Sequence, residues 1–123
     1  MQKILISLIA LLLIAGCSNS QESFETIDIT TIEGKVVDGW KIVDVREIEE
    51  FEDGHIPSAL NVPLSTISKG EHSVLEQVQK YIVICQSGNR SQTASEQPHK
   101  AGFQVLNVKQ GMGSWTGDIV SPK

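Results

Sequence analysis

Apolar and polar positions along the chain predict five short strands. Residues 24–29 alternate between apolar and polar side chains, which is typical of a strand with one exposed face. Residues 41–45 and 81–84 are rich in apolar, β-branched side chains, as expected for buried strands. Further runs with apolar residues occur at 59–62 and 104–108. We therefore expect a strand in each of these five segments.

The segments between the strands favour helices. Charged residues with good helix propensity occupy 46–51, and Gly54 ends that segment. We expect helices or helical turns from Thr30 or Thr31 to Val37, over 46–51, over 65–69, over 71–80 with Val74, Leu75 and Val78 on one face, and over 91–101. The last helix should kink or end near Gln97, because Pro98 lacks an N–H donor and clashes with the preceding turn. Residues 111–115 are predicted to be irregular.

Strands that alternate with helices predict an α/β fold. The expected architecture is a small, mostly parallel, five-stranded sheet flanked by helices. In such folds, ligands bind beyond the carboxyl ends of the strands. Cys85 comes directly after the predicted strand at 81–84, so we expect it at the ligand-binding edge of the sheet.

The start of the chain has the pattern of an export leader. Lys3 gives a positive start, and the apolar run at 4–14 suits a signal-peptide core but is too short to span a bilayer. Cys17 follows one apolar and two small residues, and this ending resembles the lipidation site of a bacterial lipoprotein. We expect a signal peptide at 1–16, a lipidated tether at 17–23, a folded domain at 24–118 and a C-terminal tail at 119–123. The pattern also fits an ordinary secretory leader or an uncleaved anchor.

Charge and cysteine content limit the partners. Without residues 1–16 the chain has nine basic and 15 acidic residues, a formal charge of −6, which argues against a nucleic-acid partner. With Cys17 acylated, Cys85 is the one remaining thiol, so no disulfide can form within the chain. The three histidines lack the spacing of metal ligands, so we expect no metal site. The expected location is outside the cytoplasm, with a lipid anchor in a bacterial membrane.

The segment from Cys85 to Arg90 is the candidate site. A cysteine at the end of a parallel strand, a small polar loop and an arginine resemble a nucleophile loop that cradles an anion. The thiolate is the reactive form of cysteine, and loop amides, a following helix N-terminus and Arg90 all favour negative charge. A buried strand-end cysteine followed by an ordinary turn explains the same segment. The segment alone leaves both interpretations open.

An ordered set of motifs, together with this loop, resembles a single-domain rhodanese, a thiosulfate sulfurtransferase-like protein. The resemblance covers roughly residues 25–116, and its motifs lie at 42–47, 51–59, 61–63, 81–91, 102–105 and 111–115. It implies a two-step transfer in which Cys85 takes sulfur from a donor as a persulfide and gives it to an acceptor. It implies no cofactor; the partners would be a small sulfur donor or protein persulfide, a thiol acceptor, and the membrane through the lipid anchor.

The resemblance also assigns roles to individual residues. Cys85 and Arg90 would be catalytic, with a binding loop made of Gln86, Ser87, Gly88 and Asn89. Asp44 and Arg46 would support this loop, although a surface pair on a turn explains them equally well. We expect His55 to hydrogen-bond within its turn, and Trp115 to be a core plug near the site.

Other functions remain open. Cysteine-based phosphatases place one residue more between cysteine and arginine than the four found here, which favours sulfur over phosphate chemistry. A non-catalytic binding or redox-sensing module, or a structural adaptor, would retain the same fold.

The chain departs from the family pattern at Ser58, Gln110 and Pro98. The loop also has no basic residue besides Arg90, so we expect thiosulfate to bind weakly.

Overall fold

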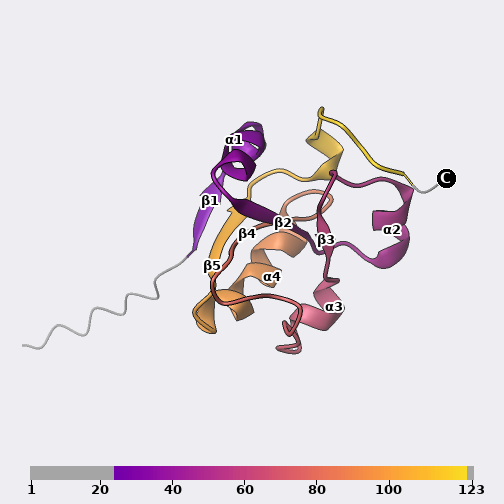
Figure 1. The fold of residues 1–123 in the computed structure, drawn as a ribbon. Helices are drawn as coiled ribbons and strands as arrows, with labels where there is room; N and C mark the ends of the chain where they lie inside the picture. The colour runs from indigo at the N-terminus through magenta and orange to yellow at the C-terminus, as the bar shows by residue number, and fades with distance from the viewer. Residues whose placement is uncertain (1–23, 122–123) are drawn as a thin grey trace, which may run out of the picture.

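Five parallel strands form the centre of the fold in the computed structural model, which describes residues 24–121 (Figure 1). The strands are β1 (Glu25–Ile27), β2 (Trp40–Asp44), β3 (Leu60–Asn61), β4 (Lys80–Ile84) and β5 (Gln104–Val108). Their order across the sheet is β1-β5-β4-β2-β3, and every neighbouring pair is parallel. The predicted fold class is therefore confirmed, and the sheet is entirely parallel. The predicted leader, Cys17 and the tether lie outside the described residues.

Helices connect the strands and flank the sheet. They are η1 (Ile29–Thr31), α1 (Ile32–Val37), α2 (Ile48–Asp53), α3 (Leu64–Ile67), α4 (Asn89–Lys100) and η2 (Met112–Ser114), where η marks a 3-10 helix. At the start of α2, the side chains of Glu47 and Glu50 each accept a backbone N–H of the other, which forms a capping box. Gly54 ends this helix, as predicted. No helix within residues 24–121 is long and apolar enough to cross a membrane.

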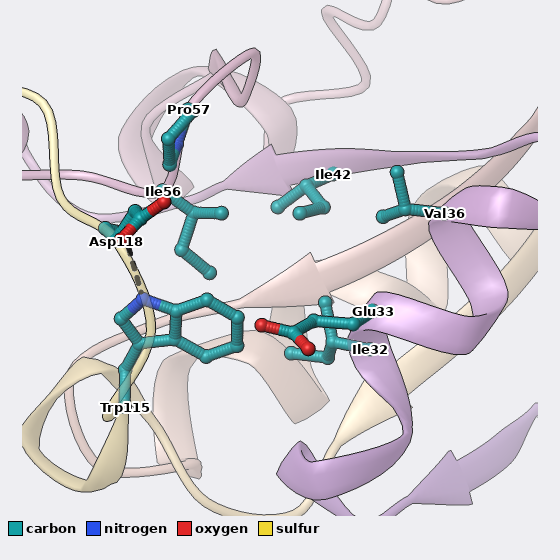
Figure 2. Close-up of a pocket in the computed structure, with 8 residues that line it drawn as sticks. All are labelled: Ile32, Glu33, Val36, Ile42, Ile56, Pro57, Trp115 and Asp118. Carbon is teal, nitrogen blue, oxygen red and sulfur yellow. Dashed lines mark hydrogen bonds between the residues drawn. The ribbon is translucent and has the colours of Figure 1, made fainter.

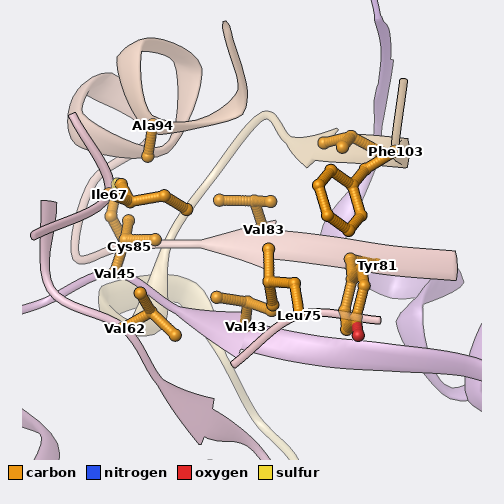
Figure 3. Packing of buried hydrophobic residues seen from close by; sticks show 11 residues of the cluster. Val43, Val45, Val62, Ile67, Leu75, Tyr81, Val83, Cys85, Ala94 and Phe103 are labelled. Atoms are coloured by element: carbon orange, nitrogen blue, oxygen red, sulfur yellow. The ribbon is translucent and has the colours of Figure 1, made fainter. Parts of the chain in front are cut away.

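Two apolar clusters pack against opposite faces of the sheet. One contains Val43, Val83 and Val105 of the central strands, with Ile67 of α3 and Ala94 of α4, and it includes Cys85 (Figure 3). The other consists mainly of isoleucines and covers the face on which η1, α1 and η2 lie. Because successive strand residues point to opposite faces, Ile82 and Ile84 pack into this second cluster while Tyr81, Val83 and Cys85 pack into the first.

The helix predicted over 71–80 is wrong. This segment forms two turns, closed by hydrogen bonds from Leu75 N to His72 O and from Gln79 N to Glu76 O. Leu75 is buried, but the other two residues of the predicted apolar face, Val74 and Val78, are 62% and 83% exposed. The phenol oxygen of the core residue Tyr81 accepts the N–H of Glu76 at 2.7 Å. In an α-helix, this N–H would instead donate to the carbonyl four residues earlier.

The last long helix is predicted to kink or end near Gln97, and the predicted end there is wrong. Helix α4 continues to Lys100 with Pro98 inside it. Pro98 is almost completely buried, and its carbonyl accepts the N–H of Phe103 at 3.0 Å. Proline removes only one helical hydrogen bond, and here it does so in the last turn, where packing against the core holds the chain.

The C-terminal segment packs against the domain beyond residue 118. Val120 forms an antiparallel bridge with His55, with backbone hydrogen bonds of 3.0 and 2.8 Å. Trp115 is partly buried against the second cluster, and its indole N–H donates to the carbonyl of Asp118 at 3.0 Å. Figure 2 shows the indole beside an open hollow lined by Ile32, Glu33, Val36, Ile42, Ile56, Pro57, Trp115 and Asp118. Trp115 is therefore half-buried at the edge of the second cluster, away from the Cys85 face.

Candidate active site

Cys85 lies at the carboxyl end of the central strand β4. Its side chain is 0% exposed and packs beside Val45 and Ile67, below Ala94 of α4 (Figure 3). The position is the one predicted from the sequence, because the carboxyl edge of a parallel sheet is where the following loop turns toward a helix. It is also the one free cysteine among residues 24–121.

Hydrogen bonds from the loop and from the start of α4 surround the Cys85 sulfur. The N–H of Gly88 donates to Sγ at 3.1 Å. Burial acts to raise the pKa of Cys85, but the Ser91 hydroxyl and the N–H groups of Ser91, Ser87 and Gly88 together lower it below its ordinary value. The arrangement therefore stabilises a thiolate.

The Ser91 hydroxyl is free to turn toward this thiolate. Its other acceptors are the carbonyls of Gly88 and Val108, at 3.3 and 3.4 Å. Both distances are long for a hydroxyl donor, which prefers less than about 3.0 Å. A charged sulfur is the stronger acceptor, and the single hydroxyl proton can point to it when the thiolate forms.

Two glycines let the loop fold tightly against the chain that follows β5. Gly88 has a φ of +97°, and a Cβ there would also lie 2.2 Å from the carbonyl oxygen of Lys109. A Cβ on Gly111 would lie 2.2 Å from the carbonyl carbon of Gln86. The N–H of Met112 then donates to the carbonyl of Cys85 at 2.8 Å. The backbone of residues 109–113 therefore packs directly against the loop that follows Cys85.

Gln110, which departs from the family pattern, is anchored at the other side of this segment. Its amide oxygen accepts the N–H of Ile29 at 2.9 Å, and its amide nitrogen donates to Asp28 at 2.8 Å. Asp28 also accepts from the Thr30 side chain and backbone, and these bonds with that of Gln110 lower the pKa of Asp28 to about 2. Gln110 therefore ties the segment behind the loop to η1.

Asp44 and Arg46 form a buried ion pair beside the loop. The guanidinium of Arg46 makes three contacts of 2.8–3.1 Å with the carboxylate of Asp44, and the two side chains are 6% and 1% exposed. The alternative of a surface pair is therefore wrong. Arg46 also donates to the carbonyl of Gly54 at 2.7 Å and to the side-chain oxygen of Gln86 at 3.4 Å. Asn61 donates to the carbonyls of both Asp44 and Arg46, which fixes the end of β2.

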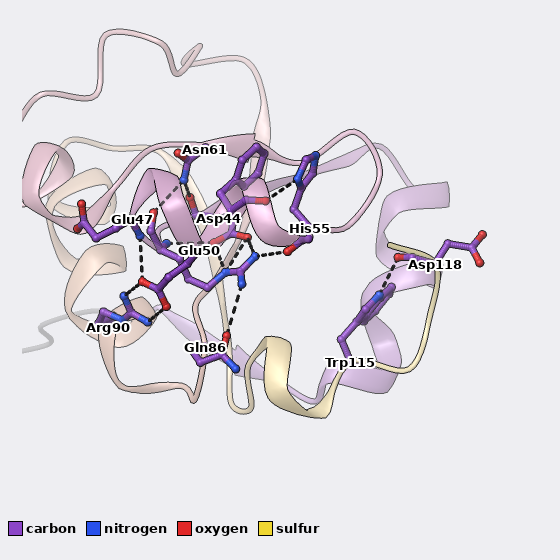
Figure 4. A network of polar contacts seen from close by, with 12 residues as sticks. Asp44, Glu47, Glu50, His55, Asn61, Gln86, Arg90, Trp115 and Asp118 are labelled. Carbon is purple, nitrogen blue, oxygen red and sulfur yellow. Dashed lines mark hydrogen bonds and ion pairs between the residues drawn. The ribbon is translucent and has the colours of Figure 1, made fainter. Parts of the chain in front are cut away.

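Arg90 is held by a partner that the sequence did not indicate. Its two terminal nitrogens lie 2.5 and 2.8 Å from the two carboxylate oxygens of Glu50, which comes from α2 (Figure 4). The hydrogen bonds from Arg90 lower the pKa of Glu50 to about 2, against the opposing effect of burial. Arg90 is also close enough to interact electrostatically with Cys85 and Glu47.

The remaining predicted residues occupy different environments. Gln86, Ser87 and Asn89 are exposed, whereas Gly88 is buried.

His55 is not part of the loop: its Nδ1 lies 2.8 Å from the carbonyl of Phe51, and its ring stacks on the Phe51 ring. This is the structural role expected from the sequence. Within residues 24–121, no three His, Cys, Asp or Glu side chains are grouped closely enough to bind a metal ion.

Ser91 and Glu50 are site residues that the sequence pattern did not indicate. Ser91 directly follows the loop, so its place in the first turn of the helix was a usable signal. Glu50 lies 40 positions before Arg90, and no local pattern connects the two.

Known proteins are similar to this chain over most of its folded domain. The model of the Rhodanese-like domain family matches residues 30–118. A putative sulfur carrier protein of Bacillus subtilis is 40% identical over 103 residues, which are 81% of this chain and 55% of that protein. The chain thus spans about half the length of that relative. A chloroplastic thiosulfate sulfurtransferase of Arabidopsis thaliana is 35% identical over 103 residues, covering 73% of this chain and 85% of its own.

A solved structure has the same architecture. The rhodanese-related protein from Thermoplasma volcanium superposes with a TM-score of 0.72 at 30% identity, covering 79% of this chain and 98% of its own. The family match, the relatives and the shared fold agree, and this chain belongs to the rhodanese-like domain family.

Proposed function

We propose that this protein is a sulfurtransferase that carries sulfane sulfur as a persulfide on Cys85. The observation that carries the proposal is the environment of the Cys85 sulfur, which combines the 3.1 Å hydrogen bond from Gly88 with a lowered pKa. The sulfurtransferase and sulfur-carrier names of the relatives support the same reaction class.

In the first step, the Cys85 thiolate attacks the sulfane sulfur of the donor. With thiosulfate, a bond forms between Sγ and the outer sulfur, the bond between the two thiosulfate sulfurs breaks, and its electron pair leaves with sulfite. The N–H of Gly88 already donates to the Cys85 sulfur, and the groups that lower the pKa of Cys85 also favour the negative persulfide that results. Arg90 lies beside the loop, paired with Glu50.

In the second step, a nucleophilic acceptor removes the sulfur. A thiol of the acceptor, as its thiolate, attacks the outer persulfide sulfur, and the electron pair of the broken S–S bond returns to Cys85. Asp44 and Arg46 act as positioning residues in both steps, because Arg46 connects the end of β2 to Gln86 of the loop.

The proposal includes an extracytoplasmic location and a lipid anchor on Cys17. It is supported by the apolar run at 4–14 and by the two small residues before Cys17. Expression in a bacterium with labelled palmitate tests it: label should enter the intact protein and should be absent from a Cys17→Ala variant. Equal labelling of both proteins would contradict the anchor.

Mass spectrometry of the protein after incubation with thiosulfate tests the sulfur transfer. One added sulfur is expected on the Cys85 peptide, it should be removed by a thiol acceptor, and the Cys85→Ser variant should transfer none. The complete burial of Cys85 favours the alternative of a non-catalytic binding or redox-sensing module. An unmodified Cys85 with every donor tried, together with retained partner binding in Cys85→Ser, would support that alternative.

A further inference from the structure

The charges next to the Cys85 loop are arranged as neutralised pairs. Arg46 is paired with Asp44, and Arg90 is paired with Glu50. The exposed loop residues Gln86, Ser87 and Asn89 carry no charge. An incoming anion therefore meets no arginine of this site that lacks a carboxylate partner.

The Glu50–Arg90 pair has a geometry that strongly favours the paired state. The contact is bidentate, with two parallel N–H···O bonds of 2.5 and 2.8 Å. Glu50 is oriented from its own helix as well, because the N–H of Glu47 donates to the same carboxylate at 3.2 Å. With a pKa of about 2, Glu50 remains ionised at every physiological pH. Arg90 thus faces a fixed negative charge.

This pair affects charged and uncharged donors differently. An anionic donor gains from Arg90 only by displacing or sharing Glu50, and it is repelled by Glu50 and by the nearby Glu47. An uncharged donor meets neither effect. The side chains of Arg90 and Glu50 are 32% and 36% exposed, so solutes can reach both of them.

We infer that Glu50 is a specificity-determining residue that disfavours small anionic sulfur donors at Cys85, in favour of donors whose transferable sulfur is uncharged. This inference rests on the proposed sulfur transfer and names its donor class: the protonated persulfide of a thiol, R–S–SH. The Cys85 thiolate bonds to the terminal sulfur, the S–S bond of the donor breaks, and its electron pair leaves as R–S⁻. Cys85 then carries S–SH, and no oxidant or reductant is consumed.

Two alkylating reagents of similar size, one anionic and one neutral, test this inference without requiring sulfur transfer. Iodoacetate is anionic and iodoacetamide is neutral, and both modify a cysteine thiolate. Because Cys85 is buried, both reagents need the same opening of the loop, and the ratio of their rates isolates the effect of charge. The full chain is used, and peptide mass spectrometry separates Cys85 from Cys17. Glu50→Gln is compared with Glu49→Gln, which makes the same charge change at an exposed position of α2.

The iodoacetate-to-iodoacetamide rate ratio should rise roughly fivefold in Glu50→Gln, the size expected for releasing one partly exposed charge contact. It should stay within experimental error of wild type in Glu49→Gln. The KM for thiosulfate should fall by a similar factor in Glu50→Gln and stay at the wild-type value in Glu49→Gln. Glutamine keeps an oxygen acceptor for Arg90 and for the Glu47 N–H, so the fold should be retained.

Three results would overturn the inference: an unchanged ratio in Glu50→Gln, an equal rise in Glu49→Gln, or no alkylation of Cys85 by either reagent. A failure of the proposed function has a different signature. In that case wild-type Cys85 acquires no sulfur from any donor, whereas the alkylation ratio still responds to Glu50 and identifies the pair as a charge filter for the thiol.

Discussion

The guanidinium of Arg46 lies 2.8 Å from the carboxylate of Asp44, and this pair is buried at the end of β2 directly beside the Cys85 loop. A buried charge without its partner is strongly unfavourable, whereas the intact pair satisfies both side chains. The pair also contacts the carbonyl of Gly54 and the side chain of Gln86, so it joins α2, β2 and the loop. Its integrity should therefore matter more to the site than that of any surface ion pair.

Replacing Asp44 with asparagine should destabilise the fold by roughly 3–5 kcal/mol, because Arg46 is left buried and uncompensated. Urea unfolding measures this change. Asp53→Asn, which makes the same substitution at the exposed end of α2, should alter the free energy of unfolding by less than about 0.5 kcal/mol. Similar values for the two variants would show that the buried pair contributes no more than a surface carboxylate.

Ser91→Ala should raise the pKa of Cys85, because the hydroxyl is among the groups that lower it. The thiolate fraction at neutral pH then falls, by about tenfold for each unit of pKa. The pH dependence of Cys85 alkylation, read from the Cys85 peptide, gives the pKa directly. Ser95→Ala is the matched control, since that buried hydroxyl donates to the carbonyl of Ser91 at 2.7 Å. An equal pKa shift in both variants would count against the direct role of Ser91.

Gly111→Ala should destabilise the protein by about 2 kcal/mol or more, because the new Cβ would lie 2.2 Å from backbone atoms of Gln86. The loop must move away, so Cys85 should also lose its lowered pKa. Thermal unfolding and the alkylation profile report the two effects. Gly34→Ala in α1 has open space and should stabilise the protein by about 0.5–1 kcal/mol. A neutral Gly111→Ala would mean that the loop does not depend on this close approach.

The stability difference between wild type and Glu50→Gln should depend on pH. The pKa of Glu50 falls from 4.5 to about 2 on folding, so ionised Glu50 stabilises the folded state. This contribution is fully present above the unfolded pKa and is lost as the pH falls toward 2. Since both partners are partly exposed, we expect less than about 1 kcal/mol at neutral pH. Urea unfolding of both proteins across this pH range checks it, and a difference that grows in acid would contradict the sign.

The failed prediction over 71–80 shows where local patterns stop being informative. Val74, Leu75 and Val78 have helical spacing, but only Leu75 reaches the core. The phenol of Tyr81 instead holds the backbone of Glu76 in a turn. Helix propensity is a small preference, and contacts made by a neighbouring strand outweighed it. Pro98 illustrates the opposite case, because burial keeps it in a helix that its own chemistry disfavours.

The sequence by itself determined the five strands, their parallel arrangement and the position of Cys85, because apolar periodicity and the order of strands and helices are local properties. It also indicated the loop residues and the Asp44 and Arg46 positions through the family resemblance. Only the tertiary structure decided which distant partners the two arginines contact. Arg90 with Glu50 and Arg46 with Gln86 each join residues 40 positions apart. These contacts join α2 to the start of α4 and the segment after β2 to the loop after β4, and no spacing within one segment encodes how such segments meet.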